Sequence, residues 1–154
     1  MQICCNIFII CRMSLENINR FKQMLEESGY SRTNARLLIF KCLQSSKEPL
    51  TLREIYMQLQ TQIDRTSVYR NVELFELLGV VRRIQIGWKY KLELSEAYST
   101  HHHHAVCSRC GAITSFEENK ILKEGIVSLA SDLQFSLAGH SLELQGICKQ
   151  CAKK

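Results

Sequence analysis

The stretch HHHHAVCSRCG, residues 101–111, decides how this chain of 154 residues can fold. It ends with the pair Cys107-x-x-Cys110, and a second pair, Cys148-x-x-Cys151, stands close to the end of the sequence. Each pair can place two thiolates on one tight turn, and two facing turns complete the tetrahedral shell of sulfurs that structural zinc takes. The long spacing between the pairs predicts that the metal fastens the last strand of a small domain to its first. Removing the metal should therefore unfold that domain.

Two other interpretations of the four cysteines stay open. A rubredoxin-like iron site uses the same ligands, and thiol pairs also carry redox chemistry. A thioredoxin-type motif, however, stands alone at a strand-to-helix junction, whereas here two pairs match. Residues 1–13 lack the basic region and the small-residue cleavage site of a signal peptide. We therefore expect a reducing, cytoplasmic compartment, in which cysteines bind metal more often than they form disulfides.

The four histidines that open the same stretch offer metal ligands on two faces. In a strand their side chains alternate, so His102 and His104 point one way and His101 and His103 the other. Imidazole suits zinc, iron, nickel or copper, and an added carboxylate makes such a site more suitable for Fe(II) or Mn(II). Glu93 is the nearest carboxylate upstream. The simpler interpretation of the run is a solvent-exposed polar strand edge.

Upstream of the histidines, hydrophobic spacing predicts helices followed by a hairpin. Thr51 and Glu54 have the spacing of a capping box at the start of one helix, and Gly87-Trp88 fits the turn between two strands. The helices are expected at about residues 15–29, 35–43, 51–59 and 65–78, and the strands at 80–86 and 89–94. Helices followed by a two-stranded hairpin form a winged helix-turn-helix.

The remaining segments predict a second, smaller domain. A polar linker is expected at residues 95–100, followed by strands at 102–106, 112–116 and 141–147 and a helix at 117–133. The fold class is therefore α+β: an N-terminal winged helix-turn-helix, residues 14–94, and a small α/β domain with a structural zinc, residues 101–154. Residues 1–13 are expected to be an apolar tail or a mis-annotated start, with Met13 as the true first residue. No apolar run approaches the ~20 residues that cross a bilayer, so no membrane partner is expected.

The predicted helix at 65–78 has two faces, one apolar and one polar, when it is wound at about 100° per residue. The apolar side holds Val68, Val72 and Phe75, and the polar side holds Thr66, Tyr69, Arg70 and Glu73. Such a helix fits the major groove, where Arg70 can bond a guanine or a phosphate and Tyr69 a thymine methyl or a phosphate. Arg65 lies near the positive helix N-terminus, which also favours a phosphate. A solvated polar face is the simpler interpretation.

The excess positive charge lies in the same half of the sequence. Residues 12–94 hold 14 Lys and Arg against 9 Asp and Glu, whereas the rest of the chain holds six of each. Arg36 stands at the start of the second helix, and Arg82, Arg83 and Lys89 line the predicted hairpin. This distribution suits a nucleic-acid-binding half joined to a neutral half with a different role.

With these motifs the sequence resembles the ferric uptake regulator family, from about Leu15 to Cys151. The matching pieces are Thr33-x-x-Arg36, RTSVYR at 65–70, LGVVR at 78–82, LEL at 92–94, HHHHAVCSRCG at 101–111, HSLELQG at 140–146 and CKQC at 148–151. The resemblance implies a metal-responsive transcriptional repressor and no enzyme activity. It also implies a homodimer that binds double-stranded operator DNA with an inverted repeat, without a small-molecule substrate. The second domain would then be the dimerisation domain.

The resemblance assigns roles to two groups of residues. The structural zinc would be held by Cys107, Cys110, Cys148 and Cys151. The expected DNA contacts are Arg36, Arg65, Thr66, Tyr69 and Arg70, of which Tyr69 and Arg70 match contacts of the family.

A second divalent metal, Fe²⁺, Zn²⁺ or Mn²⁺, is expected as the regulatory cofactor. Glu93, His102 and His104 match three ligands of a regulatory site at the hinge between domains. His101, His103 and His140 fall at or beside a second, C-terminal site, and His103 stands where many members have aspartate.

The sequence departs from the family at two further ligands of the hinge site. The histidine before the third helix is missing, since residues 47–50 read KEPL, and the carboxylate after Cys-Gly falls near Ser115. Either Glu48 or Glu117 substitutes for them, or the hinge site is weak, or the other face of the histidine run carries the sensing.

Two alternative functions follow from the same residues. One is a peroxide- or thiol-redox-responsive regulator of the same architecture, for which free thiols of low pKa are expected at Cys107 and Cys110. The other is a zinc-ribbon interaction module without a sensory metal, for which one metal per chain is expected rather than two or more.

Overall fold

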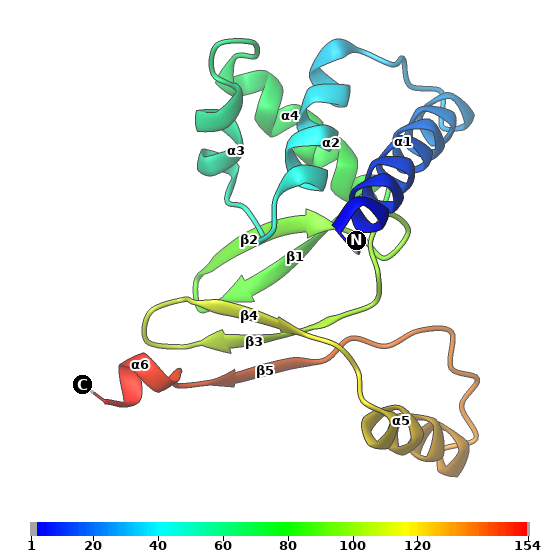
Figure 1. The fold of residues 1–154 in the computed structure, drawn as a ribbon, viewed down its shortest axis with the longest axis vertical. Coiled ribbons are helices and arrows are strands. Elements are labelled where there is room, and N and C mark those ends of the chain that lie inside the picture. Colours follow the sequence, from blue (N-terminus) through cyan, green and yellow to red (C-terminus); the bar gives the residue numbers. More distant parts are fainter. Residues whose placement is uncertain (1–2, 154) are drawn as a thin grey trace. The chain divides into compact units, whose positions relative to one another are not determined.

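The computed structural model describes the backbone of residues 3–153 and the side chains of residues 15–153. Four helices and a hairpin come first, followed by a three-stranded sheet with two further helices (Figure 1). The elements are α1 (Ile3–Glu27), α2 (Asn34–Ser45), α3 (Leu52–Leu59), α4 (Arg65–Leu77), β1 (Val81–Ile86), β2 (Lys89–Leu94), β3 (His103–Cys107), β4 (Ile113–Phe116), α5 (Lys120–Asp132), β5 (Glu143–Gly146) and α6 (Lys149–Ala152). The chain divides into two units. The first runs to Gln85 and includes Lys89–Ser99, and the second comprises Ile86–Trp88 and the residues from Thr100 onward.

Side-chain caps set where helices of the first unit begin. Asp64 Oδ1 accepts a hydrogen bond from the Ser67 N–H at 2.9 Å and starts α4. The capping box predicted at the start of α3 is confirmed: the Thr51 hydroxyl accepts the Glu54 N–H at 3.1 Å, and Glu54 Oε2 accepts the Thr51 N–H at 2.6 Å. Caps of this kind satisfy N–H groups that the first turn of a helix leaves without partners. The start of each of these two helices is therefore set by a pair of residues three positions apart in the sequence.

Aromatic rings hold the helices of the first unit together. Phe21 of α1 stacks on Phe40 of α2 with ring centroids 4.2 Å apart, and Phe75 of α4 meets Phe21 edge-on at 5.1 Å. The predicted apolar face of α4 is confirmed, because Val68, Val72 and Phe75 are buried in this cluster. Burial of one side of α4 leaves its polar side outward, which is the side of interest for function.

The first helix is longer than the hydrophobic spacing predicts. A start at Leu15 is expected from the sequence, whereas α1 begins at Ile3. The backbone of residues 3–13, expected as an apolar tail or a misplaced start, thus continues the helix, and the side chains before Leu15 lie outside the described residues. Among the helices of the described chain, none combines the length and the apolar character needed to span a bilayer.

Most of the segment predicted as a polar linker, residues 95–100, belongs to the first unit, which includes it up to Ser99. Its Tyr98 side chain is only 8% exposed and belongs to the same core as Phe21 and Phe40. One aromatic residue in a segment this short sets no period, so hydrophobic spacing could not reveal this burial.

The second unit is built on a three-stranded sheet in the order β4-β3-β5. The central strand β3 pairs antiparallel with β4, where His103 faces Phe116, and parallel with β5, where Cys107 faces Gly146. The sequence predicts these three strands, each within one or two residues of its observed bounds. The helix predicted from Glu117 starts instead at Lys120, because Asn119 Oδ1 accepts the Leu122 N–H at 2.8 Å and caps it there.

Candidate metal centres and nucleic-acid interface

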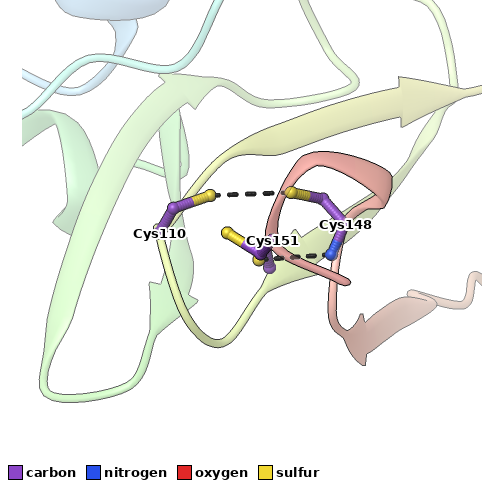
Figure 2. Close-up of side chains that lie close together, drawn as sticks. Cys110, Cys148 and Cys151 are labelled. Carbon is purple, nitrogen blue, oxygen red and sulfur yellow. Dashed lines mark hydrogen bonds between the residues drawn. The ribbon is translucent and has the colours of Figure 1, made fainter. Parts of the chain in front are cut away.

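The parallel pairing of β3 with β5 brings the two cysteine pairs together. Cys107 ends β3, and Cys148 precedes α6, two residues after the end of β5. Cys110 Sγ lies 3.8 Å from Cys148 Sγ, and the four sulfurs of the two pairs all lie within 4.8 Å of one another (Figure 2). A tetrahedron with Zn–S bonds of about 2.3 Å has edges of about 3.8 Å, so the sulfurs already have the spacing of a Cys₄ zinc shell.

Two thiols of this quartet, those of Cys107 and Cys151, have pKa values shifted in opposite directions. The Cys148 N–H donates to Cys107 Sγ at 3.3 Å, and this bond, together with the N–H groups of Cys110 and Arg109, lowers the pKa of the Cys107 thiol to about 6. Burial raises the pKa of the Cys151 thiol to about 12. Cys107 is therefore a ready thiolate, whereas Cys151 needs a positive charge to lose its proton. A divalent cation bound by all four sulfurs supplies that charge, which makes the donor set suitable for a metal.

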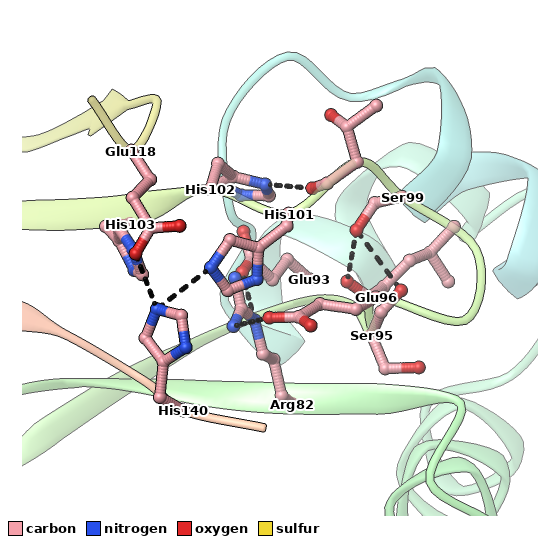
Figure 3. A network of polar contacts seen from close by, with 12 residues as sticks. Arg82, Glu93, Ser95, Glu96, Ser99, His101, His102, His103, Glu118 and His140 are labelled. Carbon is pink, nitrogen blue, oxygen red and sulfur yellow. Dashed lines mark hydrogen bonds and ion pairs between the residues drawn. The ribbon is translucent and has the colours of Figure 1, made fainter. Parts of the chain in front are cut away.

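A second cluster gathers three histidines and a glutamate at the other end of β3 (Figure 3). His101 Nε2 lies 3.3 Å from His140 Nε2, and His140 Nε2 lies 3.0 Å from Glu118 Oε1. The Glu118 oxygen is also 3.9 Å from Nε2 of His103, whose side chain is almost fully buried. Three imidazoles and a carboxylate that converge within 4.8 Å form a donor set for zinc or another divalent transition metal.

The structure brings together the predicted group His101, His103 and His140 and adds Glu118, which the sequence alone did not single out. Glu117, considered there as a substitute carboxylate, is exposed. Because His103 pairs with Phe116 across the β3–β4 ladder, the two residues after Phe116 lie next to the start of β3. The register brings both glutamates near the histidines, and the contacts with His140 and His103 identify Glu118 as the carboxylate of the cluster.

The predicted regulatory ligands His102 and His104 lie on the opposite face of β3 from His103, as their alternation predicts. Their ring centroids are 4.8 Å apart, and His104 is buried. Ser115 Oγ, at the position where the family pattern has a carboxylate, lies 3.3 Å from His104 Nδ1. His102 Nδ1 lies 2.7 Å from the Thr100 carbonyl oxygen. In the tautomer that donates this bond, Nε2 carries the lone pair that a metal would use.

Glu93, the third predicted regulatory ligand, belongs to the first unit, on β2. Arg82 Nε donates to its carboxylate at 2.5 Å, and the same guanidinium lies 3.5 Å from Glu96 (Figure 3). Glu48, the other substitute considered from the sequence, is exposed. A shared site of Glu93 with the two histidines remains a prediction.

The outward face of α4 carries the side chains predicted to contact DNA. Thr66 and Arg70 are exposed, and Tyr69 is half-buried. Arg65 donates to the Tyr69 hydroxyl at 3.3 Å, and its guanidinium lies 5.4 Å from the centre of that ring. The two residues are one helical turn apart, so this contact holds the tyrosine against the start of α4.

Two of the other predicted cations, Arg36 and Arg83, contact side chains of the protein itself. Arg36 donates through Nε to Asn71 Oδ1 of α4 at 3.2 Å and through Nη1 to the Ser31 carbonyl, so it ties α2 to α4. On the hairpin, Arg83 bonds the Glu76 carboxylate and stacks on the Tyr90 ring at 4.1 Å. The DNA contact expected of Arg36 remains a prediction, and these partners within the protein could not be recognised from the sequence, because they are distant in the chain.

Known proteins are similar to this chain along most of its length. The model of the "Ferric uptake regulator family" matches residues 27–145. The "Ferric uptake regulation protein" of Campylobacter upsaliensis is 31% identical over 145 residues, covering 89% of this chain and 90% of the relative. The "Peroxide operon regulator" of Bacillus subtilis is 28% identical over 149 residues, covering 92% and 98%.

Among solved structures, the fold is similar to that of the Helicobacter pylori ferric uptake regulator, with a TM-score of 0.77 and 21% identity over 92% of this chain and 95% of that one. The Helicobacter pylori protein has three functional metal binding sites. At this level of identity the likeness concerns the fold.

Proposed function

The chain belongs to the ferric uptake regulator family, whose members are metal-responsive transcription regulators and not enzymes, and on that premise we propose that it is a repressor that binds inverted-repeat operator DNA as a homodimer when a regulatory metal is bound. One observation carries the proposal. A single strand, β3, holds ligands of two separate metal-binding groups, with His103 at its start and Cys107 at its end. The first group suits an exchangeable metal and the second a permanent one.

The cysteine quartet is proposed as the structural zinc site. The sulfur spacing fits a closed tetrahedral shell, which leaves no open position for a substrate. A zinc ion bound there would fasten β5 and α6 to the end of β3. A thiol-redox regulator is the weaker alternative, because its chemistry needs one exposed pair, whereas here both pairs face each other.

The histidine ligands are proposed as the sensory part of the molecule. His101, His103, His140 and Glu118 offer a compact donor set, and Glu93, His102 and His104 stay predicted as the hinge set. A metal held by the hinge set would link the two units and restrict the angle between them. In a dimer, only some angles present both copies of α4 to major grooves about 34 Å apart. A metal with about 100-fold higher affinity for that arrangement would favour it by about 2.7 kcal/mol.

DNA binding is proposed for the outward face of α4. Arg70 and Thr66 would reach base edges, Tyr69 would contact a thymine methyl or a phosphate, and Arg65 would hold Tyr69 and attract a phosphate at the helix N-terminus. Arg36 would act by positioning α4 through Asn71.

A homodimer through the second unit is proposed from its uncovered apolar residues. Several apolar side chains in and after α5 are more than half exposed: Ile121, Val127, Leu129, Leu133 and Phe135. A set of this kind marks an interaction surface, and a second copy of the chain would cover it while placing two α4 helices on one operator. We also infer a cytoplasmic location, where thiols stay reduced.

The test is DNA binding measured by fluorescence anisotropy on inverted-repeat promoter fragments, with Fe(II), Mn(II), Zn(II) or Ni(II) added to protein that retains one zinc. Metal should tighten binding. Arg70→Ala should weaken it by about 1–3 kcal/mol without changing metal content, whereas Lys41→Ala, which removes an exposed cation from α2, should not. His102→Ala should keep the fold and lose the metal response. Binding that a chelator leaves unchanged, in protein that still holds its zinc, would contradict the proposal.

A further inference from the structure

The second cysteine pair lies on a helix that is too short to be stable by itself. Helix α6, Lys149–Ala152, has four residues and so about one turn. Cys148 occupies its N-cap position and makes no capping hydrogen bond through its side chain within the described residues. Isolated helices shorter than about 12–15 residues are marginal in water. The position of Cys151, which lies within α6, therefore depends on contacts that hold the helix from outside.

Two hydrogen bonds fasten the chain just before this helix. The Ser108 N–H donates to the carbonyl of Gly146, the last residue of β5, at 2.8 Å. The Cys148 N–H donates to Cys107 Sγ at 3.3 Å. Both bonds join the turn of the first cysteine pair to the approach to α6. They position Cys148, but they end three residues before Cys151.

The side chain of Arg109 reaches the helix itself. Its Nη1 donates to the Cys151 carbonyl at 2.5 Å, between residues 42 positions apart in the sequence. The same carbonyl accepts the Lys153 N–H, and a carbonyl oxygen has two lone pairs, so both bonds can form. An arginine that bonds the last carbonyls of a helix also interacts favourably with the negative end of the helix dipole. Because Arg109 stands between Cys107 and Cys110, the first cysteine turn holds the second.

The charge of Arg109 also suits this place. Four thiolates carry more negative charge than a divalent cation neutralises, so an occupied shell of this kind is an anion. A guanidinium keeps its proton in proteins and offsets part of that charge. Hydrogen bonds from a charged donor are also stronger than those between neutral groups. Arg109 therefore supplies both a bond to α6 and a charge opposite to that of the shell.

We propose that Arg109 is a positioning residue that keeps Cys151 in the metal shell and slows the loss of metal from the cysteine quartet. The inference rests on the proposed function of the quartet as a structural zinc site. With the guanidinium bond in place, α6 keeps its turn, and the four sulfurs stay within 4.8 Å of one another. Without it, α6 frays and Cys151 leaves, which opens a coordination position to water or to a competing chelator. Arg109 itself binds a carbonyl oxygen and not the metal.

The experiment measures the rate at which zinc passes from the full chain to an excess of the coloured chelator pyridylazoresorcinol. Arg109→Ala removes the bond, and Lys149→Ala, which removes an exposed cation of the second cysteine pair, is the matched control. We expect Arg109→Ala to release zinc roughly 5–10-fold faster, as the loss of one hydrogen bond of ordinary net strength predicts. Lys149→Ala should release it at the rate of the unaltered protein. Equal rates in the two variants overturn the proposal.

Arg109→Lys tests whether a cationic donor at this position restores slow release. Lysine keeps the charge but offers a compact ammonium group in place of the planar guanidinium fork, so its rate should lie between those of Arg109→Ala and the unaltered protein. This variant also decides the matter if Arg109→Ala loses its zinc during purification. In that case, release from Arg109→Lys at the rate of Lys149→Ala overturns the proposal.

Hydrogen exchange shows whether the effect lies in α6. The Ala152 N–H donates to the Cys148 carbonyl at 2.9 Å. In zinc-loaded protein this amide should exchange faster in Arg109→Ala than in Lys149→Ala, whereas the amides of β3 should exchange equally in both. Unchanged exchange in α6, or equal acceleration in α6 and β3, overturns the positioning role.

Zinc content separates this proposal from the proposed function. If the unaltered chain and its Cys148→Ser/Cys151→Ser variant hold equal amounts of zinc, the quartet is not the zinc site, and the role of Arg109 fails with it. If the quartet holds zinc and Arg109→Ala releases it at an unchanged rate, only the role of Arg109 fails. None of these measurements uses DNA, so their outcome does not depend on operator binding.

Discussion

Replacing both cysteines of the closing pair, Cys148→Ser with Cys151→Ser, should unfold the second unit and leave the first folded. In the described part of the second unit, the buried apolar residues are Val106, Cys107, Ala130 and Cys151. Two of these four belong to the quartet itself. Burial of the Val106 side chain contributes about 1.5–3 kcal/mol, whereas a structural zinc contributes about 10–16 kcal/mol of apparent binding free energy at pH 7. Ordering the backbone costs about 1–2 kcal/mol per residue, so the metal decides whether this unit folds.

The assay is hydrogen exchange read by mass spectrometry, with zinc content measured on the same samples. Peptides that cover β3 and β5 should lose protection when zinc is lost, while peptides from α2 to α4 should keep it, because the first unit has its own aromatic core. Cys42→Ser is the control, since this cysteine lies in α2, outside the quartet, and bonds Gln58. Protected amides in β3 and β5 of zinc-free double variant would refute the reasoning.

Three further predictions test the first unit and the hairpin. Trp88, the sole tryptophan, is fully exposed. Its fluorescence should therefore have the emission maximum of tryptophan in water and be quenched by iodide. A blue-shifted emission that iodide does not quench would contradict the hairpin structure. Thr51→Ala should lower the free energy of unfolding by about 1 kcal/mol in urea denaturation, whereas Thr51→Ser should not; equal losses would show that the cap is not the cause. Burial raises the pKa of Glu54, but hydrogen bonds from Thr51 outweigh it and leave the pKa below its usual range. The ionised Glu54 side chain therefore stabilises the folded protein above the unfolded pKa of about 4.3, and this stabilisation is lost as pH falls through the folded pKa. The urea midpoints of the protein and of its Glu54→Gln variant should accordingly converge in acid. A constant gap from about pH 6 to about pH 3 would count against this assignment.

Local patterns predicted the features that depend on residues close in sequence. The capping box at Thr51 spans three residues, the apolar face of α4 repeats every three to four, and the histidines of β3 alternate. Each rule follows from the period of one helix or one strand, so it needs no knowledge of what packs against that element. The matched cysteine pairs also belong here, because their spacing within each pair already indicates a metal shell.

What the sequence could not show depends on contacts between distant segments. Glu118 joins the histidine cluster because of the β3–β4 register, and neither its residue type nor its spacing distinguishes it from Glu117. Tyr98 is buried because α1 reaches back across some eighty residues of sequence to bond its carbonyl. Arg83 resembles a free cation in the sequence until its partner Glu76 is seen. The tertiary fold determines which side chains of this kind become partners, and local sequence patterns do not reveal it.

The two ligand groups on β3 differ in chemistry in a way that suits the permanent and the sensed metal proposed for them. Four thiolates form a soft, closed shell that favours zinc and leaves no position for exchange. Three imidazoles with the Glu118 carboxylate bind through nitrogen and oxygen, a donor set shared by several divalent metals, so its occupancy follows their availability. Because Cys107 and His103 are four residues apart on β3, the zinc-held end gives the histidine end a fixed platform.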